Sequence, residues 1–196
     1  MMLPWETKMR LLPLLPLLMM PVLAACGAQG ESMGRMGGAA PRLMINTQLL
    51  GPGGEQLGTA TLAQESDGVK VTAAMTGLPA GNYAIHLHAV GKCEGPAFTT
   101  AGGHFNPAMK QHGNMNPAGE HAGDLPNITV GADRRGTLDA MRPGLRLADG
   151  DAPLLDADGA AIVLHAAPDD YRTDPSGNSG ARIACGVITR SSAAPS

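Results

Sequence analysis

The chain has 196 residues, of which 43% are hydrophobic and 3% aromatic, and a formal net charge of −3. This length allows one domain with additional segments. Phosphate binding requires clustered Lys and Arg, and a mildly acidic chain without a basic run lacks them, so we expect no nucleic-acid partner.

The first 25 residues have the pattern of a secretory signal. Lys8 and Arg10 precede the almost wholly apolar stretch 11–25, which ends in small residues. This stretch is too short to span a bilayer about 30 Å thick. A buried core helix is the alternative, but the prolines within the stretch would each damage it. The sequence predicts a signal peptide over residues 1–25, and Met2 and Met9 remain alternative starts.

The signal ends in Leu-Ala-Ala-Cys at 23–26, which resembles the lipobox of bacterial lipoproteins. The resemblance implies cleavage before Cys26 and acylation of its thiol and its new amino group. Because more than one acyl chain anchors a protein stably, we expect an exported, membrane-anchored lipoprotein that faces the periplasm or the cell exterior. Residues 26–40 would then comprise the lipidated cysteine and a flexible tether rich in Gly and Met.

The three cysteines are Cys26, Cys93 and Cys185. An odd number in a secreted protein needs an explanation. If Cys26 carries lipid, the other two form an even pair in a compartment where disulfides persist. The sequence therefore predicts a Cys93–Cys185 disulfide.

From Pro41 onward, short candidate strands alternate with turns that contain Gly, Pro and Asp. This pattern is typical of an all-β sandwich or barrel, and no long helical pattern is present. Aromatic residues are scarce, so the core must consist of Val, Ile, Leu, Ala and Met. The candidate strands are 42–50, 56–65, 69–76, 83–88, 128–130, 136–141, 161–165 and 183–189.

Two long irregular stretches, 88–126 and 166–182, separate these strands. Long loops in a compact domain are usually functional or disordered. These contain most of the histidines, and Cys93 and Cys185 lie at or near their ends. We therefore interpret them as functional loops.

His86 and His88 are two residues apart in a candidate strand. Side chains at this spacing point to the same face, as a shared metal would need, although a solvent-facing pair is the alternative. His165 ends the apolar run Ala-Ile-Val-Leu-His. Such a histidine is usually structural, but here it is the last of six.

The first long loop adds His104, His112 and His121, with Asp124 three residues after the last of them. An isolated loop histidine is more often a solvated surface group. Three imidazoles and a carboxylate, however, make up a tetrahedral zinc site with nitrogen and oxygen ligands.

The motifs around these residues resemble those of copper/zinc superoxide dismutases in their bacterial exported form. They are HLHAVGKC at 86–93, GGHFNP at 102–107, VLH at 163–165 and GNSGARIACGVI at 177–188. The match covers about residues 42–190, and we assign the domain to 41–190, followed by a short tail at 191–196. The resemblance implies an all-β, Greek-key antiparallel β-barrel or sandwich with long metal-binding and active-site loops.

The resemblance also implies two metal cofactors, copper and zinc, with four protein ligands each. The copper ligands would be His86, His88, His104 and His165. The zinc ligands would be His104, His112, His121 and Asp124. Because His104 belongs to both sets, it would bridge the two metals as an imidazolate.

Two further residues have implied roles beside the metals. Arg182 would lie next to copper and receive the anionic substrate. Asp169 would link a copper histidine to a zinc histidine, and we prefer it by spacing to the adjacent Asp170. Such outer partners fix the tautomer and orientation of a ligand.

The implied reaction is the dismutation of superoxide into oxygen and hydrogen peroxide by redox cycling of copper. Zinc has no redox chemistry, so it would shape the site, and His104 would leave copper on reduction and carry a proton. The runner-up is a non-catalytic copper-binding or copper-delivery domain on the same fold. A zinc hydrolase is a weaker alternative, because His-Glu-x-x-His is absent. The resemblance permits either a monomer or a homodimer.

Overall fold

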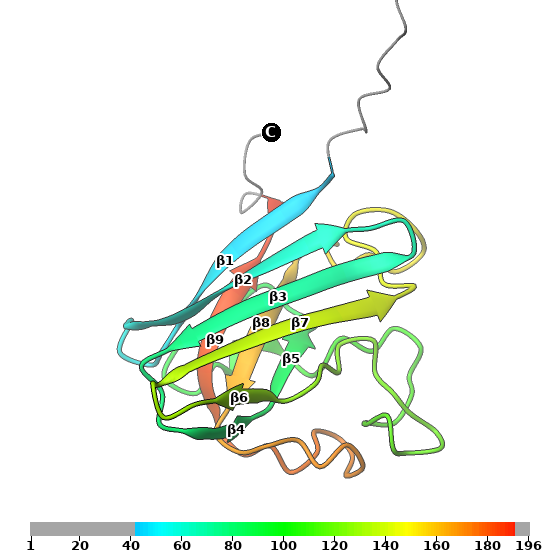
Figure 1. Cartoon of the computed structure of the whole chain (residues 1–196). Coiled ribbons are helices and arrows are strands. Elements are labelled where there is room, and N and C mark those ends of the chain that lie inside the picture. The colour runs from blue at the N-terminus through cyan, green and yellow to red at the C-terminus, as the bar shows by residue number, and fades with distance from the viewer. Residues whose placement is uncertain (1–41, 191–196) are drawn as a thin grey trace, which may run out of the picture. The chain divides into compact units, whose positions relative to one another are not determined.

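The computed structural model describes residues 42–190, which form nine β-strands and one 3-10 turn, η1 (Thr99–Ala101) (Figure 1). Within this range no helix is long and apolar enough to cross a lipid bilayer. The prediction of an all-β domain is therefore confirmed. The strands are β1 Met44–Leu50, β2 Gln56–Gln64, β3 Gly68–Thr76, β4 Gly81–Tyr83, β5 Ile85–His88, β6 Ile128–Val130, β7 Arg135–Pro143, β8 Ala160–His165 and β9 Arg182–Ile188.

The predicted strands match the observed ones to within two residues at each end, except for the stretch 83–88. This stretch is divided between β4, which ends at Tyr83, and β5, which begins at Ile85. The break occurs because Ala84 bonds to the segment that follows β8: its N–H donates to the Ala167 carbonyl at 2.9 Å, and its carbonyl accepts from the His165 N–H at 2.8 Å. The single predicted strand was therefore wrong at this point.

All neighbouring strands pair antiparallel, in the order β4-β6-β7-β3-β2-β1-β9-β8-β5. β3 pairs with β7 instead of β4, which is the crossover of a Greek key. β1 and β9 share only the pair Leu50↔Cys185, so the nine-stranded sheet turns a corner between these two strands. β4 and β5, at the two ends of the order, are separated only by Ala84. The sheet therefore curves into a nearly closed barrel.

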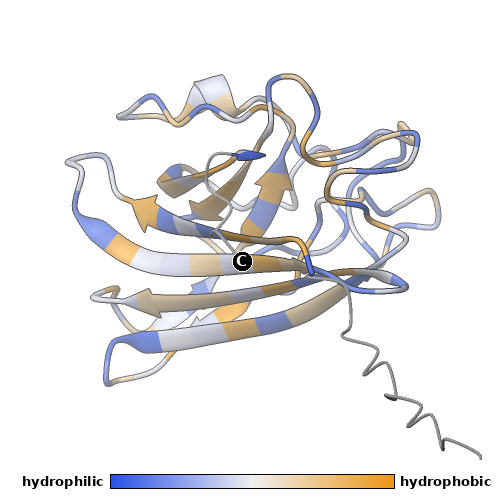
Figure 2. Cartoon of the chain, turned by 90° about the horizontal axis from the view of Figure 1, so that it is seen from above, coloured by the Kyte–Doolittle hydropathy of each residue, from blue (hydrophilic) through white to orange (hydrophobic). Residues whose placement is uncertain are grey.

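The core lies inside the barrel and is mainly aliphatic, as predicted. Along β7 buried and exposed positions alternate, with Leu138 and Ala140 directed inward. Figure 2 shows the corresponding alternation of hydrophobic and hydrophilic segments along the strands. Tyr83 and Phe105 are the aromatic side chains in this core. Its largest fully buried members include Ile45, Leu49, Leu62, Met75, Ile85, Leu87, Ile128, Leu147, Leu154, Ile162 and Leu164.

β5 and β8 differ from the other strands, because every residue in them is buried. One face of each strand packs into the core through Ile85, Leu87 and Leu164. Their other face is covered by the loop that follows β5, whose Phe98 forms a second apolar cluster with Val163 and other buried residues. The face of β5 and β8 that points away from the core is thus also buried, so polar side chains on it are shielded from water.

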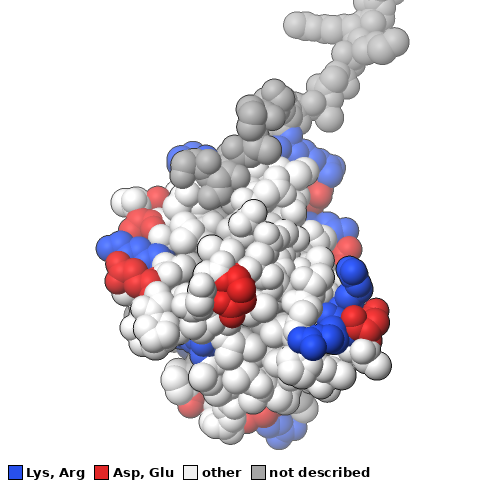
Figure 3. Space-filling model, turned by 90° about the vertical axis from the view of Figure 1, so that its left-hand side faces the viewer, with Lys and Arg blue, Asp and Glu red and all other residues white. Residues whose placement is uncertain are grey.

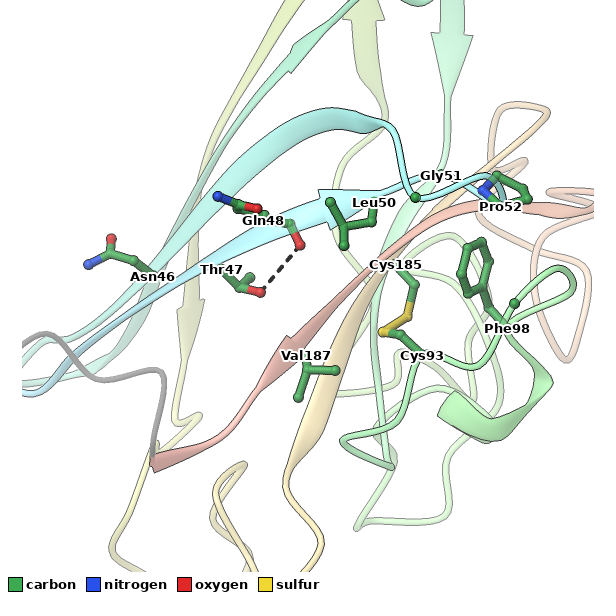
Figure 4. Close-up of a pocket in the computed structure, with 12 residues that line it drawn as sticks. Asn46, Thr47, Gln48, Leu50, Gly51, Pro52, Cys93, Phe98, Cys185 and Val187 are labelled. Atoms are coloured by element: carbon green, nitrogen blue, oxygen red, sulfur yellow. Dashed lines mark hydrogen bonds between the residues drawn. A yellow bond between two sulfur atoms is a disulfide. The ribbon is translucent and has the colours of Figure 1, made fainter.

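The Cys93–Cys185 disulfide joins the loop after β5 to β9, as predicted. It lies at the corner where β1 meets β9, beside Leu50 and Phe98 (Figure 4). A cavity of about 530 Å³ opens at this corner. Its walls carry no titratable side chain and no histidine among the described residues, so metal or acid–base chemistry must be located elsewhere.

Charged groups on the surface are of mixed sign. On the face in Figure 3, Lys and Arg lie next to Asp and Glu at the edges of a largely uncharged area. Lys70 and Asp139 form an exposed ion pair at 3.0 Å. Exposed pairs of this kind contribute little to stability. The free energy of folding therefore depends mainly on the core, the disulfide and the loops that they hold.

We expect loss of the disulfide to destabilise the metal-free domain strongly. The bridge spans 92 positions, and chain entropy for such a loop corresponds to about 4–5 kcal/mol. Replacement of Cys93 and Cys185 by Ser should lower the free energy of unfolding by this order, measured by urea denaturation. As the matched control, a thiol reductant should destabilise the wild-type domain but leave the double variant unchanged. A loss below about 1 kcal/mol would contradict the role of the bridge.

Candidate metal centre

Six buried or nearly buried histidines gather on the outer face of β5 and β8. His86 and His88 alternate with Ile85 and Leu87, so their rings point away from the core. His165 ends β8 on the same outer side. Isolated bridges bring two loop residues to β5, since His88 pairs with His104 and His86 pairs with Asp124. The loop after β5 is thereby folded back over its own strand.

The first cluster comprises His86, His88, His104 and His165. One ring nitrogen from each lies within 4.8 Å of those of the others. The ring centroids of His86 and His104 are 4.0 Å apart, and those of His86 and His165 are 4.9 Å apart. Four imidazoles converge here on one point.

Hydrogen bonds show which ring nitrogen of each histidine carries a proton. The other nitrogen carries none and is called bare below. His88 Nδ1 lies 2.9 Å from the Gly102 carbonyl, and His165 Nδ1 lies 3.3 Å from the Gly180 carbonyl. A carbonyl can only accept, so Nδ1 donates and Nε2 carries no proton. His86 donates from Nε2 to a carboxylate oxygen at 2.8 Å, which leaves its Nδ1 bare.

These bare nitrogens also have no hydrogen-bond partner. Among residues 42–190, four buried side-chain polar atoms lack a hydrogen-bond partner: His86 Nδ1, His88 Nε2, His104 Nε2 and His165 Nε2. An unsatisfied buried acceptor costs about 1–3 kcal/mol. Four such acceptors that face one another fit a bound metal cation, because each would gain a ligand bond there.

The second cluster comprises His104, His112, His121 and Asp124. The Nδ1 atoms of the three histidines lie 2.9, 3.1 and 3.2 Å, respectively, from Asp124 Oδ1. The other carboxylate oxygen, Oδ2, accepts from the Gly113 and His121 N–H groups at 2.9 and 3.0 Å. These backbone bonds orient Oδ1 toward the cluster. Three nitrogens and one oxygen are a donor set that suits tetrahedral zinc.

His104 belongs to both clusters through different atoms. Its Nε2 is one of the four bare nitrogens, and its Nδ1 contacts Asp124. A single ring therefore separates the two candidate metal positions.

Asp169 forms a second link between the clusters. Its Oδ2 lies 2.8 Å from His86 Nε2, and its Oδ1 lies 2.9 Å from His112 Nε2. The link is at Asp169 and not at Asp170, whose exposed carboxylate accepts instead from Thr173 and Asn178. The carboxylate of Asp169 thus holds one ring of each cluster.

The sequence interpretation missed a residue that fixes Asp169. The Asn127 side chain forms two hydrogen bonds with the Asp169 backbone, donating to its carbonyl at 2.9 Å and accepting from its N–H at 2.8 Å. Asn127 follows Asp-Leu-Pro in the sequence, but no motif shows that its amide would meet a residue 42 positions away.

Burial lowers the pKa of three histidines in the first cluster, to about 2 for His88, about 3 for His165 and about 4 for His104. These rings are therefore neutral at pH 7, and the bare nitrogen of each can bind a metal without losing a proton; only His104, if it bound metals through both nitrogens, would release one. Burial also lowers the pKa of His112, but its hydrogen bonds to Asp124 and Asp169 outweigh this effect and raise the pKa to about 9.

The two carboxylates stay ionised despite their burial. Burial raises the pKa of Asp124, but hydrogen bonds from His104, His112 and Gly113 hold it far below its ordinary value. The same balance, with His112 and His86 as partners, lowers the pKa of Asp169. Each cluster therefore has fixed negative charge that favours a cation.

Arg182 begins β9 and lines the same cavity as the histidines, with a volume of about 510 Å³. Its guanidinium donates to the Phe98 carbonyl at 2.7 Å and to the Gly102 carbonyl at 2.6 Å. Burial lowers its pKa, yet a guanidinium keeps its charge in proteins. The cavity therefore contains a fixed cation next to bare imidazole nitrogens. Its lining also includes His88, His104, His121, His165, Lys110 and Asp174.

Comparisons with known proteins agree with this geometry. The family model for copper/zinc superoxide dismutase matches residues 56–188. A superoxide dismutase [Cu-Zn] 1 of Aquifex aeolicus is 41% identical over 151 residues, covering 76% of this chain and 89% of that protein. A superoxide dismutase [Cu-Zn] of Caulobacter vibrioides is 44% identical over 138 residues, covering 69% of this chain and 79% of that protein.

A solved structure shows the same fold. The SOD-like protein of Bacillus subtilis is 40% identical in sequence and superposes with a TM-score of 0.71, covering 74% of this chain and 99% of that one. The extent of the family match, the identity to these relatives and the shared fold agree. The chain belongs to the copper/zinc superoxide dismutase family.

Proposed function

We propose that this chain is a superoxide dismutase, which converts two superoxide anions and two protons into oxygen and hydrogen peroxide. The observation that carries the proposal is the set of four bare, buried imidazole nitrogens that share a cavity with Arg182. Such a set binds a redox metal, and the guanidinium provides a place for an anionic substrate.

We assign copper to the first cluster and zinc to the second. The copper set, His86, His88, His104 and His165, consists only of imidazoles, and three of them line the cavity. The zinc set, His104, His112, His121 and Asp124, includes a carboxylate, and His112 and Asp124 are buried away from the cavity. A site with four protein ligands and no open position is typical of structural zinc.

Copper, when bound, supplies one-electron chemistry, whereas zinc supplies none. The contributions of the protein can be stated atom by atom. Arg182 attracts superoxide and binds it by hydrogen bonds beside the first cluster. His104 Nε2 is a bare nitrogen at the cavity, so with Nδ1 bound to zinc it would carry the single proton of the neutral ring whenever it is not a copper ligand. Asp169 keeps the rings of His86 and His112 in place.

A non-catalytic copper-binding domain is the second candidate. It is favoured by the relative in Bacillus subtilis, which is named a superoxide dismutase-like protein and is 41% identical over 146 residues. A domain that only stores copper has no need for a fixed cation beside the ligands. The presence of Arg182 in the cavity therefore supports the enzyme.

We also propose that the protein is exported and anchored to a membrane by lipid on Cys26, in line with the signal-like residues 1–25 and the tether at 26–40. These residues lie outside the described range of the structure. The assembly state, monomer or homodimer, stays a prediction as well.

The first test of this proposal concerns the anchor. Cys26→Ser should shift the protein from the membrane fraction to the soluble fraction or block its processing, because the acylated thiol would be lost. The measurement is fractionation of cells followed by intact mass of the product. Membrane partitioning and processing identical to those of the wild type would count against lipidation.

The second test separates the two metals. Asp124→Ala should remove most of the zinc while retaining much of the copper, because Asp124 is a member of the second cluster only. His165→Ala should remove most of the copper while retaining much of the zinc, and it should abolish superoxide consumption. Metal content by mass spectrometry and superoxide decay by pulse radiolysis measure both outcomes. Equal loss of both metals from both variants would show that the site cannot be divided in this way.

The third test distinguishes the enzyme from a copper-binding domain. Arg182→Ala should keep both metals but lower the rate about tenfold or more. It should also flatten the salt dependence, because the attraction of an anion is screened over about 10 Å at 0.1 M salt. Arg182→Lys should recover part of the rate, and Arg182→Glu should be slower than Arg182→Ala.

The matched control is Arg146→Ala, which removes the same charge from an exposed pair with Asp149 outside the cavity. Superoxide decay at several salt concentrations, on protein of known metal content, is the measurement. If fully metallated Arg182→Ala were as fast as the wild type at low salt, the assigned role of Arg182 would be wrong.

A further inference from the structure

Ser179 places a buried hydroxyl against a ligand of the first cluster. It lies in the loop between β8 and β9, and its side chain is inaccessible to solvent. Its Oγ is 3.1 Å from His165 Nδ1, the ring nitrogen that points away from the cluster. This is the only polar contact of the Ser179 hydroxyl among residues 42–190.

The direction of this hydrogen bond follows from the rest of the site. His165 Nδ1 also lies 3.3 Å from the Gly180 carbonyl, which can only accept. Nδ1 therefore carries the proton and shares it between the Gly180 carbonyl and Ser179 Oγ, and Nε2 stays bare. Two acceptors from consecutive residues hold the ring from one side.

The backbone around Ser179 fixes the position of these acceptors. The Ser179 carbonyl accepts from the Ala167 N–H at 2.9 Å, close to the end of β8. The Ser179 N–H donates to the Ser176 carbonyl at 3.3 Å within the same loop. Because the loop is tied to the strand that carries His165, the hydroxyl and the imidazole cannot move independently.

The buried hydroxyl of Ser179 adds little to the stability of the metal-free fold. When Oγ accepts from His165, the hydroxyl hydrogen meets no acceptor among the described residues. A buried donor without a partner is unfavourable. Among residues 42–190 the ring of His165 is the one polar partner of this hydroxyl, so an effect of the hydroxyl on the site acts through that ring.

We propose that Ser179 is a positioning residue for His165 and, through this ring, for the copper site; the inference rests on the proposed function. The second acceptor on Nδ1 restricts the rotation of the imidazole and increases the basicity of Nε2. Loss of such an outer partner typically weakens metal binding 10–100-fold. Since the Gly180 carbonyl remains, the lower end of this range applies.

Ser179→Ala tests the proposal on the full-length protein loaded with zinc. Its affinity for copper(II), from competition with a chelator of known affinity, should fall about tenfold. The electron paramagnetic resonance spectrum of bound copper(II) should change, because one ligand ring gains freedom. The thermal midpoint of the metal-free variant should equal or exceed that of the wild type, and zinc affinity should be unchanged.

Ser176→Ala is the matched control, because Ser176 lines the cavity in the same loop but has no side-chain hydrogen bond to a histidine. It should leave copper affinity and the spectrum unchanged. Copper affinity of Ser179→Ala within twofold of the wild type, with the same spectrum, would overturn the proposal. Equal losses of copper affinity, zinc affinity and metal-free stability would also overturn it, since they would show a purely structural role.

The outcome can be separated from that of the proposed function. If the wild-type protein bound copper but did not consume superoxide, the enzymatic proposal would fail. The difference in copper affinity between Ser179→Ala and the wild type would still decide the role of Ser179.

Discussion

The arrangement of this domain depends on the sharing of one imidazole between two clusters of ligands. The ring of His104 offers Nε2 to one cluster and Nδ1 to the other, so both must form around the same side chain. The bridge between His88 and His104 brings the loop back to β5, and the bridge between His86 and Asp124 does so a second time. The loop after β5 therefore carries ligands of both clusters, and its contacts with His86 and His88 in turn hold the loop against β5.

Strands β5 and β8 of the barrel carry His86, His88 and His165. The loops supply the other ligands and the carboxylates that orient the rings. Asp169 joins the clusters through His86 and His112, and it comes from the other long loop (orange in Figure 1). Without metals, four bare nitrogens are buried together without a hydrogen-bond partner, which is unfavourable. Metal binding relieves this cost, and a ligand that binds only the folded state stabilises it.

Much of this could be predicted from the sequence, because local patterns carry the information. Short segments between turns with Gly, Pro and Asp indicated the strands, the spacing of His86 and His88 predicted that they share one face, and the cysteine count indicated the disulfide. Contacts between distant segments were not accessible in this way. The break at Ala84 depends on hydrogen bonds with the chain after β8. The amide of Asn127 and the hydroxyl of Ser179 likewise acquire their roles only from tertiary neighbours.

The most direct test of the shared imidazole is a crystal structure with anomalous scattering measured at the copper and zinc absorption edges. The account predicts copper among His86, His88, His104 and His165, and zinc among His104, His112, His121 and Asp124. The ring of His104 should lie between the two peaks. A single metal position, both metals in one cluster, or a His104 ring that contacts only one of them would contradict it.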